Sequence, residues 1–315
     1  MLSLFAHRRR RVAGSWVCRS GRAPRCAAAY DERMPGIDLH THSSVSDGTE
    51  SPAELVDAAV AAGLDVVAIT DHDSTTGWEP AFAAARGTGL TVVPGIELST
   101  QLDYASVHVL GYLVDPANPA LVSAMERIRE ERLHRAEAMV ARIGADYALD
   151  WDDVLAQTTP GATVGRPHIA DALVARGHVT DRSAAFESIL HWRGGYYRPH
   201  EAPVPVDGVR LIADAGGAAV IAHPGGRGPD RLFTDRRVRE LVDAGLFGLE
   251  VDHRDNPVAS RGRWIDLASR YGLVMTGSSD YHGAGKPNRL GENTTSFEAY
   301  TAIVTHATGS APVVG

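Results

Sequence analysis

From Ile37 onward, short apolar runs alternate with longer stretches in which apolar residues recur at helical spacing. The runs expected to form strands are 37–40, 65–70, 91–98, 107–114, 218–222, 248–251 and 273–276. The stretches expected to form helices around them are 51–63, 77–86, 206–215, 235–244, 256–271 and 297–307. Strands that alternate with amphipathic helices indicate a parallel sheet covered by helices, and the number of units favours a barrel.

The start of the first helix carries three signals together. Ser51 is a good N-cap, Pro52 suits the first turn, and Glu54 stands at the capping-box position. Gly63 suits the C-terminal end.

The middle of the chain has a different pattern. Residues 118–143 place apolar side chains among charges at helical spacing, and shorter helices are expected at 151–157, 167–175 and 183–191. We therefore expect a helical insertion over 115–200, which would separate a first barrel part at 35–114 from a second at 201–315.

The first 34 residues are expected to stand apart. Residues 1–33 hold eight Arg against two acidic residues, a net +6, and lack the apolar stretch that a signal peptide needs. We interpret these residues as a disordered tail, or as the result of a misassigned start codon with Met34 as the true first residue. A nucleic-acid-binding arm is a less favoured interpretation. No apolar run is long enough to span a bilayer, so a cytoplasmic protein without membrane or obligate protein partners is expected.

Charge and cysteine content narrow the chemistry. The whole chain carries −8, which leaves −14 on the residues after the tail. An acidic body repels polyanions, so a phosphate substrate is expected to be small. Both cysteines, Cys18 and Cys26, lie in the tail, so a metal site in the body must use imidazole and carboxylate ligands.

Histidine and carboxylate residues gather where the expected strands end. His40 and His42 are two apart and therefore share one face of an extended chain. Comparable residues stand near the ends of other strands: Asp47, His72, Glu97, His108, His223, His253, Asp280 and His282. Taken singly, each of these residues is explained at least as well by a solvated loop position, or by an Asp that caps the next helix, as by metal binding. Together, at the rim where parallel barrels build active sites, they indicate bound cations that offset charge repulsion.

The motifs in which these residues stand resemble the PHP (polymerase and histidinol phosphatase) family, and most of all its stand-alone TrpH-like phosphoesterases. The matching strings are DLHTHSSVSDGTESPAELV, AITDHD, GIELS, HVLGY, GRPHIADAL, AHP and GSSDYHG, spread over residues 35–290. The resemblance implies an α/β fold, a distorted (β/α)7-type PHP barrel with a helical insertion domain.

The resemblance also implies three divalent metals with nine ligands. His40, His42, Glu97 and Asp280 would hold the first metal. Glu97 would bridge to a second that also takes His108 and His223, while Asp47, His72 and His282 would hold the third. Some relatives have His in place of Asp47, so the third site could differ in metal preference. Imidazole and carboxylate ligands without thiolate suit Mn, Zn or Fe(II) alike.

Further residues are candidates for substrate binding and catalysis. Arg166 and His168 are expected to contact the substrate phosphate. The alternative is that Arg166 only begins a helix and that His168 is a surface residue. Lys286 is a weaker candidate for such a contact. We expect His253 to donate a proton to the phosphate or leaving group and Asp71 to orient His72 or a neighbour. Six other histidines are expected to be ordinary surface or packing residues: His7, His134, His178, His191, His200 and His306.

The expected activity is hydrolysis of a small nucleotide phosphate monoester, either a nucleoside 3′,5′-bisphosphate or a nucleoside monophosphate, by a metal-activated water. A 5′→3′ exoribonuclease acting on short RNA is the main alternative. Histidinol phosphatase activity and a non-catalytic metal-binding module are less favoured.

Overall fold

The structure is a computed structural model that describes residues 34–103, 105–199, 201–226 and 232–315. The expectations for residues 1–33, including the two cysteines and His7, and for His200 lie outside the described residues. Met34–Gly315 cluster as one compact unit. The expected division of that unit near residues 115 and 200 therefore stays a prediction.

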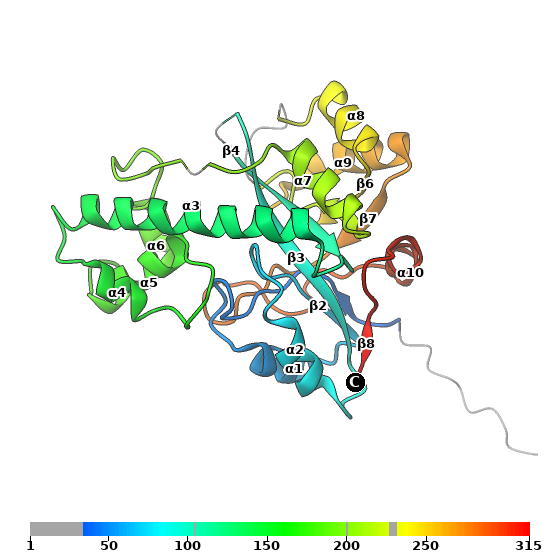
Figure 1. Cartoon of the computed structure of the whole chain (residues 1–315), viewed down its shortest axis with the longest axis horizontal. Helices are drawn as coiled ribbons and strands as arrows, with labels where there is room; N and C mark the ends of the chain where they lie inside the picture. The colour runs from blue at the N-terminus through cyan, green and yellow to red at the C-terminus, as the bar shows by residue number, and fades with distance from the viewer. Residues whose placement is uncertain (1–33, 104, 200, 227–231) are drawn as a thin grey trace, which may run out of the picture. The chain divides into compact units, whose positions relative to one another are not determined.

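A sheet of eight strands forms the centre of the described structure (Figure 1). The strands are β1 (Ile37–Asp38), β2 (Val66–Ile69), β3 (Thr91–Leu102), β4 (Ala105–Tyr112), β5 (Ala218–Ile221), β6 (Leu246–Asp252), β7 (Val274–Gly277) and β8 (Val313–Val314). Strands β1 to β7 are neighbours in chain order, and β8 pairs with β3. The two-residue β8 was not predicted, because so short a strand leaves no periodic pattern.

The expectation of a fully parallel sheet is wrong at β4, which runs antiparallel to both β3 and β5. The reason is the connection: two residues separate β3 from β4, whereas a parallel crossover needs a dozen or more. The resulting hairpin is long, from the pair Gly95–Tyr112 to the pair Leu102–Ala105. Because β4 is reversed, its first half lies beside the C-terminal half of β3.

The barrel is nearly closed between β1 and β7. Beyond the ends of these strands, Thr41 forms a parallel bridge with Tyr281. The buried Asp38 carboxylate strengthens the seam by accepting the backbone N–H groups of Ser279 at 3.0 Å and Gly291 at 2.9 Å. Burial raises the pKa of Asp38 to about 6.

The near-closed order of strands β1 to β7 confirms the distorted barrel expected from the resemblance.

Helices cover the outside of the barrel (Figure 1). They are α1 (Pro52–Ala61), α2 (Trp78–Ala85), α7 (Pro205–Asp214), α8 (Asp235–Asp243), α9 (Val258–Tyr271) and α10 (Phe297–His306). The capping box predicted for α1 is present, since Ser51 and Glu54 each accept the other's backbone N–H. None of the helices in the described parts of the chain is long and apolar enough to cross a bilayer.

Between β4 and α7 the chain forms a helical segment, by which we mean residues 119–187. It contains α3 (Pro119–Ile143), α4 (Trp151–Leu155), α5 (Arg166–Ala175) and α6 (Arg182–Glu187). The first half of α3 packs into the barrel's core through Leu121, Met125 and Ile128. Its second half joins a separate core with α4, α5 and α6, which gather around the far end of α3 in Figure 1.

Candidate metal centre

Four side chains meet at the carboxyl ends of the barrel strands, in the geometry of one metal site. The candidate ligand atoms belong to His40, His42, Glu97 and Asp280, all buried. The Nε2 atoms of His40 and His42 are 3.1 Å apart. They lie 3.3 and 3.1 Å from Glu97 Oε2 and 3.5 and 3.3 Å from Asp280 Oδ1. Ligands about 2.1 Å from a tetrahedral metal are roughly 3.4 Å apart, so this donor set fits one cation.

A second cluster lies beside the first and contains Asp47, His72 and His282, with His42 at its edge. The Nε2 atom of His282 is 3.1 Å from Asp47 Oδ1, and that of His72 is 3.7 Å from Asp47 Oδ2. The His282 Nε2 atom is buried and makes no hydrogen bond, although the carboxylate is within reach. These ligand atoms are close enough together to hold one shared cation.

Glu97 lies between the candidate ligand groups. Its Oε1 atom is 2.6 Å from His108 Nδ1 and 3.1 Å from His223 Nε2. Its Oε2 atom also faces His72 Nδ1 at 3.2 Å, in addition to the first cluster. Burial acts to raise the pKa of Glu97, but the neighbouring histidines outweigh it and hold the pKa well below its usual range. All nine expected ligands are therefore brought together, with Glu97 at the position expected for a bridge.

Two candidate ligands have left-handed backbones. Asp280 has φ of 54° and His223 has φ of 28°. Such values are uncommon away from glycine and concentrate at functional sites, where the fold holds a side chain in a fixed direction. His108 reaches the site by another route, because the antiparallel β4 carries its early residues to this rim.

Glu250 is a site residue that sequence reasoning did not assign. It is fully buried at the end of β6, with Oε1 3.0 Å from His40 Nδ1 and Oε2 accepting the His223 backbone N–H at 2.7 Å. The available signal was its place near the end of β6, in the run Glu250-Val251-Asp252 that precedes His253, but spacing alone does not select among the acids there.

Asp71 contacts the loop that carries its expected neighbours. Its carboxylate accepts the Ser43 backbone N–H and hydroxyl and the Ser46 hydroxyl, at 2.7 to 2.8 Å. Ser46 Oγ in turn lies 3.3 Å from His42 Nδ1. Asp71 thus contacts the loop after β1 and reaches His42 through the Ser46 hydroxyl; the expectation that it orients His72 or a neighbour stays a prediction.

His253 lies at the edge of the clusters. Its Nδ1 atom accepts the Asp255 backbone N–H at 3.0 Å, so Nε2 is the proton-bearing atom in the neutral ring. That Nε2 is buried, makes no hydrogen bond and points to within 3.8 Å of Asp280 Oδ2. The Asp280 carboxylate also pairs with Lys286 Nζ at 2.6 Å.

A cavity of about 420 Å³ opens onto the clusters. Asp47, His72 and His108 line it on the metal side. Its other walls are basic and aromatic and include Arg132, Arg135, Arg166, Arg182, Phe186, Tyr197 and Lys286. Two of the three expected substrate contacts, Arg166 and Lys286, therefore face this cavity.

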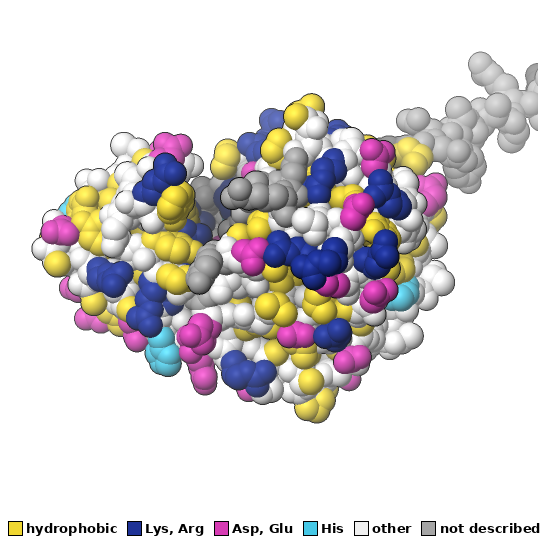
Figure 2. All heavy atoms as spheres, turned by 90° about the horizontal axis from the view of Figure 1, so that it is seen from above, with side chains coloured by type: hydrophobic (Ala, Val, Ile, Leu, Met, Phe, Trp, Pro, Cys, Tyr) yellow, Lys and Arg dark blue, Asp and Glu magenta, His cyan; other side chains and the backbone are white. Residues whose placement is uncertain are grey.

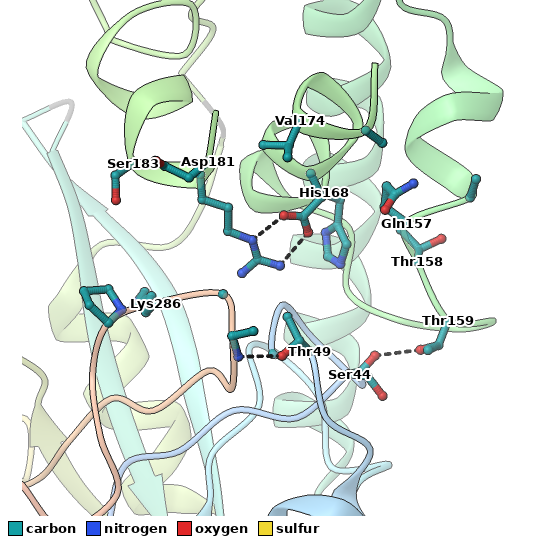
Figure 3. Close-up of a pocket in the computed structure, with 18 of the residues that line it drawn as sticks. Ser44, Thr49, Gln157, Thr158, Thr159, His168, Val174, Asp181, Ser183 and Lys286 are labelled. Atoms are coloured by element: carbon teal, nitrogen blue, oxygen red, sulfur yellow. Dashed lines mark hydrogen bonds and ion pairs between the residues drawn. The ribbon is translucent and has the colours of Figure 1, made fainter. Parts of the chain in front are cut away.

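His168 is placed elsewhere. It lines a wider neighbouring cavity of about 870 Å³, which Figure 3 shows in close-up. Its side chain is buried, and its Nδ1 accepts the Gly165 backbone N–H at 3.1 Å, which caps α5. Two other histidines expected to be unrelated to the site have local contacts: His178 bonds to the Ala148 carbonyl and His306 stacks on Phe247.

The chain is similar to known proteins over most of its length. A family model described as PHP domain matches residues 38–150. A 3′,5′-nucleoside bisphosphate phosphatase from Chromobacterium violaceum is 36% identical, with 81% of this chain and 90% of that protein covered. A phosphoribosyl 1,2-cyclic phosphate 1,2-diphosphodiesterase from Eggerthella lenta is 34% identical, covering 78% and 94%. A 5′-3′ exoribonuclease from Haemophilus influenzae is 35% identical, covering 81% and 93%.

A solved structure is also similar to this chain in fold. A crystal structure from Bifidobacterium adolescentis, assigned as a metal-dependent phosphoesterase, has a TM-score of 0.84 and 42% identity, with 87% of this chain and 97% of that chain covered. The chain belongs to the PHP domain family. The expected family is therefore confirmed.

Proposed function

We propose that this protein is a metal-dependent phosphoesterase that hydrolyses the phosphate monoester of a small nucleotide, a nucleoside 3′,5′-bisphosphate or a nucleoside monophosphate. The observation that carries the proposal is the cluster of imidazole and carboxylate groups opening into a cavity lined by four arginines. The name of the Chromobacterium relative supports a bisphosphate substrate.

Nine residues would hold three divalent metals, Mn, Zn or Fe: His40, His42, Asp47, His72, Glu97, His108, His223, Asp280 and His282. When bound, such cations supply Lewis acidity, which ionises the attacking water near neutral pH and neutralises phosphate oxygens. The donor distances of 3.1 to 3.5 Å around His40 and His42 support the first of these sites.

The cavity walls suit a nucleotide. The Arg166 guanidinium stacks 5.2 Å from the Phe186 ring centre and 5.4 Å from that of Tyr197. Arg135, which also lines this cavity, lies 5.2 Å from the ring centre of the same Tyr197. Arginines held by aromatic rings present fixed donors to a phosphate, and the rings offer stacking surface to a base.

Two residues would act near the reacting phosphate. His253 would donate from Nε2 to the leaving oxygen, since its Nδ1 is engaged by the backbone. Lys286 would keep Asp280 ionised: burial acts to raise the pKa of Asp280, but the Lys286 charge and nearby histidines hold it well below its usual value.

The test is a substrate panel run on protein whose metal content is measured in the same sample. We expect kcat/KM to be highest for a nucleoside 3′,5′-bisphosphate, lower for a monophosphate and lowest for a short RNA. Arg166→Met should raise KM for the bisphosphate about tenfold or more, whereas Arg176→Met, which removes an exposed pair with Asp153, should not. Metal-loaded protein that releases no phosphate from any nucleotide refutes the proposal.

A second candidate is 5′→3′ exonuclease activity on short RNA. It is favoured by the 870 Å³ cavity, which shares Arg182 and Lys286 with the smaller one and offers room for a further nucleotide (Figure 3). The exoribonuclease name of the Haemophilus relative also favours it. Yet on the face seen in Figure 2 acidic and basic side chains are interspersed, without a continuous basic track for a longer chain. Stepwise shortening of a 5′-phosphorylated oligonucleotide would support it, and an intact oligonucleotide after long incubation would exclude it.

A further inference from the structure

Thr163, in the helical segment, holds two barrel loops at once. Its hydroxyl donates to the His72 carbonyl at 2.8 Å, and its backbone N–H donates to the Val45 carbonyl at 2.9 Å. Thr163 is 1% exposed, so these bonds are shielded from water. One residue of the segment therefore joins the loop after β1 to the loop after β2.

Arg182, at the start of α6, holds the first of these loops at another point. Its Nη1 donates to the Asp47 carbonyl at 2.9 Å, while Nε and Nη2 form a two-point pair with Asp171 of α5, each bond 2.5 Å long. The guanidinium passes so close to Gly285 that a Cβ there would meet Nη1 at 2.1 Å. Arg182 is thus fixed from both sides while it holds the loop.

Two more bonds reach the same loops. Thr159 donates to the Ser44 carbonyl at 2.6 Å, a contact drawn in Figure 3. Arg129 of α3 donates to the Asp73 carbonyl at 2.8 Å. All five bonds therefore end on backbone carbonyls within or beside the segments that carry Asp47 and His72.

These loops lie beyond the regular strands. β1 ends at Asp38 and β2 at Ile69, and past these residues the pairing continues as isolated bridges, Thr41 with Tyr281 and His72 with Glu97. The remaining member of the cluster is tied to the same loop, since the Thr49 backbone N–H donates to the His282 carbonyl at 3.1 Å. The bonds that hold the loop after β1 therefore also hold the backbone of His282 in place.

We propose that the helical segment positions Asp47 and His72, so that cation binding at the Asp47, His72 and His282 cluster is coupled to docking of the segment on the barrel. This inference rests on the metal centre proposed above. Coupling between two equilibria is reciprocal: docking favours the cation, and the cation favours docking. Thr163 and Arg182 are positioning residues in this scheme, since they act through the backbone of the ligands.

The experiment compares metal binding in Thr163→Val and wild type. The variant keeps the shape of the side chain and loses the hydroxyl donor. We expect Mn²⁺ at the Asp47, His72 and His282 cluster to bind about tenfold more weakly, as is common when a group supporting a ligand is removed, and one fewer ion to remain after equilibration at limiting Mn²⁺. Thr163→Ser should restore binding. Thr301→Val, which removes a 2.8 Å hydroxyl bond from the exposed face of α10, should leave it unchanged.

Melting temperatures separate positioning from plain structural damage. If Thr163 acts through the cation site, Thr163→Val lowers the melting temperature more in Mn²⁺-loaded protein than in chelator-treated protein. Equal losses, together with Mn²⁺ affinity within twofold of wild type, overturn the inference. Should Thr163→Val fail to fold, Arg182→Met against its control Arg176→Met gives the same comparison. Wild-type protein that binds none of Mn²⁺, Zn²⁺ and Fe²⁺ would instead overturn the metal centre itself.

Discussion

Glu250 offers the sharpest test of how the site is built. Burial acts to raise its pKa, but the charges of His40 and His253 prevail and lower it to about 2. The carboxylate is therefore ionised at all working pH values and can only accept hydrogen bonds. It holds a proton on His40 Nδ1 and accepts the His223 backbone N–H with its other oxygen. His40 Nε2 is then the atom at which a cation competes with a proton.

Glu250→Gln keeps the shape but leaves one oxygen for two donors. If that oxygen keeps the His223 N–H, the amide NH2 faces His40 Nδ1 and favours the ring tautomer with the proton on Nε2, where the cation would bind. One hydrogen bond to a charged group is lost, worth about 1.5–3 kcal/mol. If this whole free-energy loss appears as lower cation affinity, binding at the His40 site becomes roughly 10- to 150-fold weaker.

The assay is competition of the protein with a chromophoric chelator for Mn²⁺, followed by kcat at saturating Mn²⁺. Glu240→Gln is the matched control, because Glu240 lies exposed on α8 and pairs with Arg236. Affinity in Glu250→Gln within twofold of wild type would refute the claim that Glu250 selects the His40 tautomer. A loss of stability alone, with metal affinity intact, would refute it equally.

Three further predictions follow from the described contacts. Gly285→Ala should destabilise the fold by about 1–3 kcal/mol in urea denaturation, because its Cβ would collide with Arg182, whereas Gly262→Ala in α9, whose Cβ meets nothing within 4 Å, should be neutral or stabilising. Because burial raises the pKa of Asp38 above its unfolded value, the folded chain binds the extra proton between about pH 4 and 6. The melting temperature of wild type minus that of Asp38→Asn should therefore fall as pH rises through this window, and a flat difference would contradict the shift. Glu97→Gln should lose at least one metal by elemental analysis, since five histidines contact this carboxylate; full occupancy would show that Glu97 is not a bridge.

The local sequence specified the elements well. Ser51 and Glu54 fixed the start of α1, and the apolar periodicity of residues 118–143 predicted α3 to within one residue at its start. Errors arose where pairing is decided by distant chain segments. The direction of β4 depended on a two-residue connection that was not weighed, and β8 exists because β3 offers it an open edge.

The site divides in the same way. The sequence alone predicts that His40 and His42 lie together, because a spacing of two on an extended chain puts both rings on one face whatever the rest of the fold does. The neighbouring motifs carried the other candidate ligands, because each stands beside a strand end that local pattern can locate. What local pattern cannot give is which side chains meet across the barrel.

That meeting was decided by the tertiary structure. Glu250 became the partner of His40 across 210 positions of sequence, and Thr163 reached His72 across 91. His168, a candidate substrate contact, also accepts the Gly165 backbone N–H at the start of α5, a bond that sequence pattern did not indicate. The sequence determined the donor types and their places on the strands, since these follow from local period and chemistry. Closure of the barrel and docking of the helical segment determined which donors share an ion, which support others and which face the substrate.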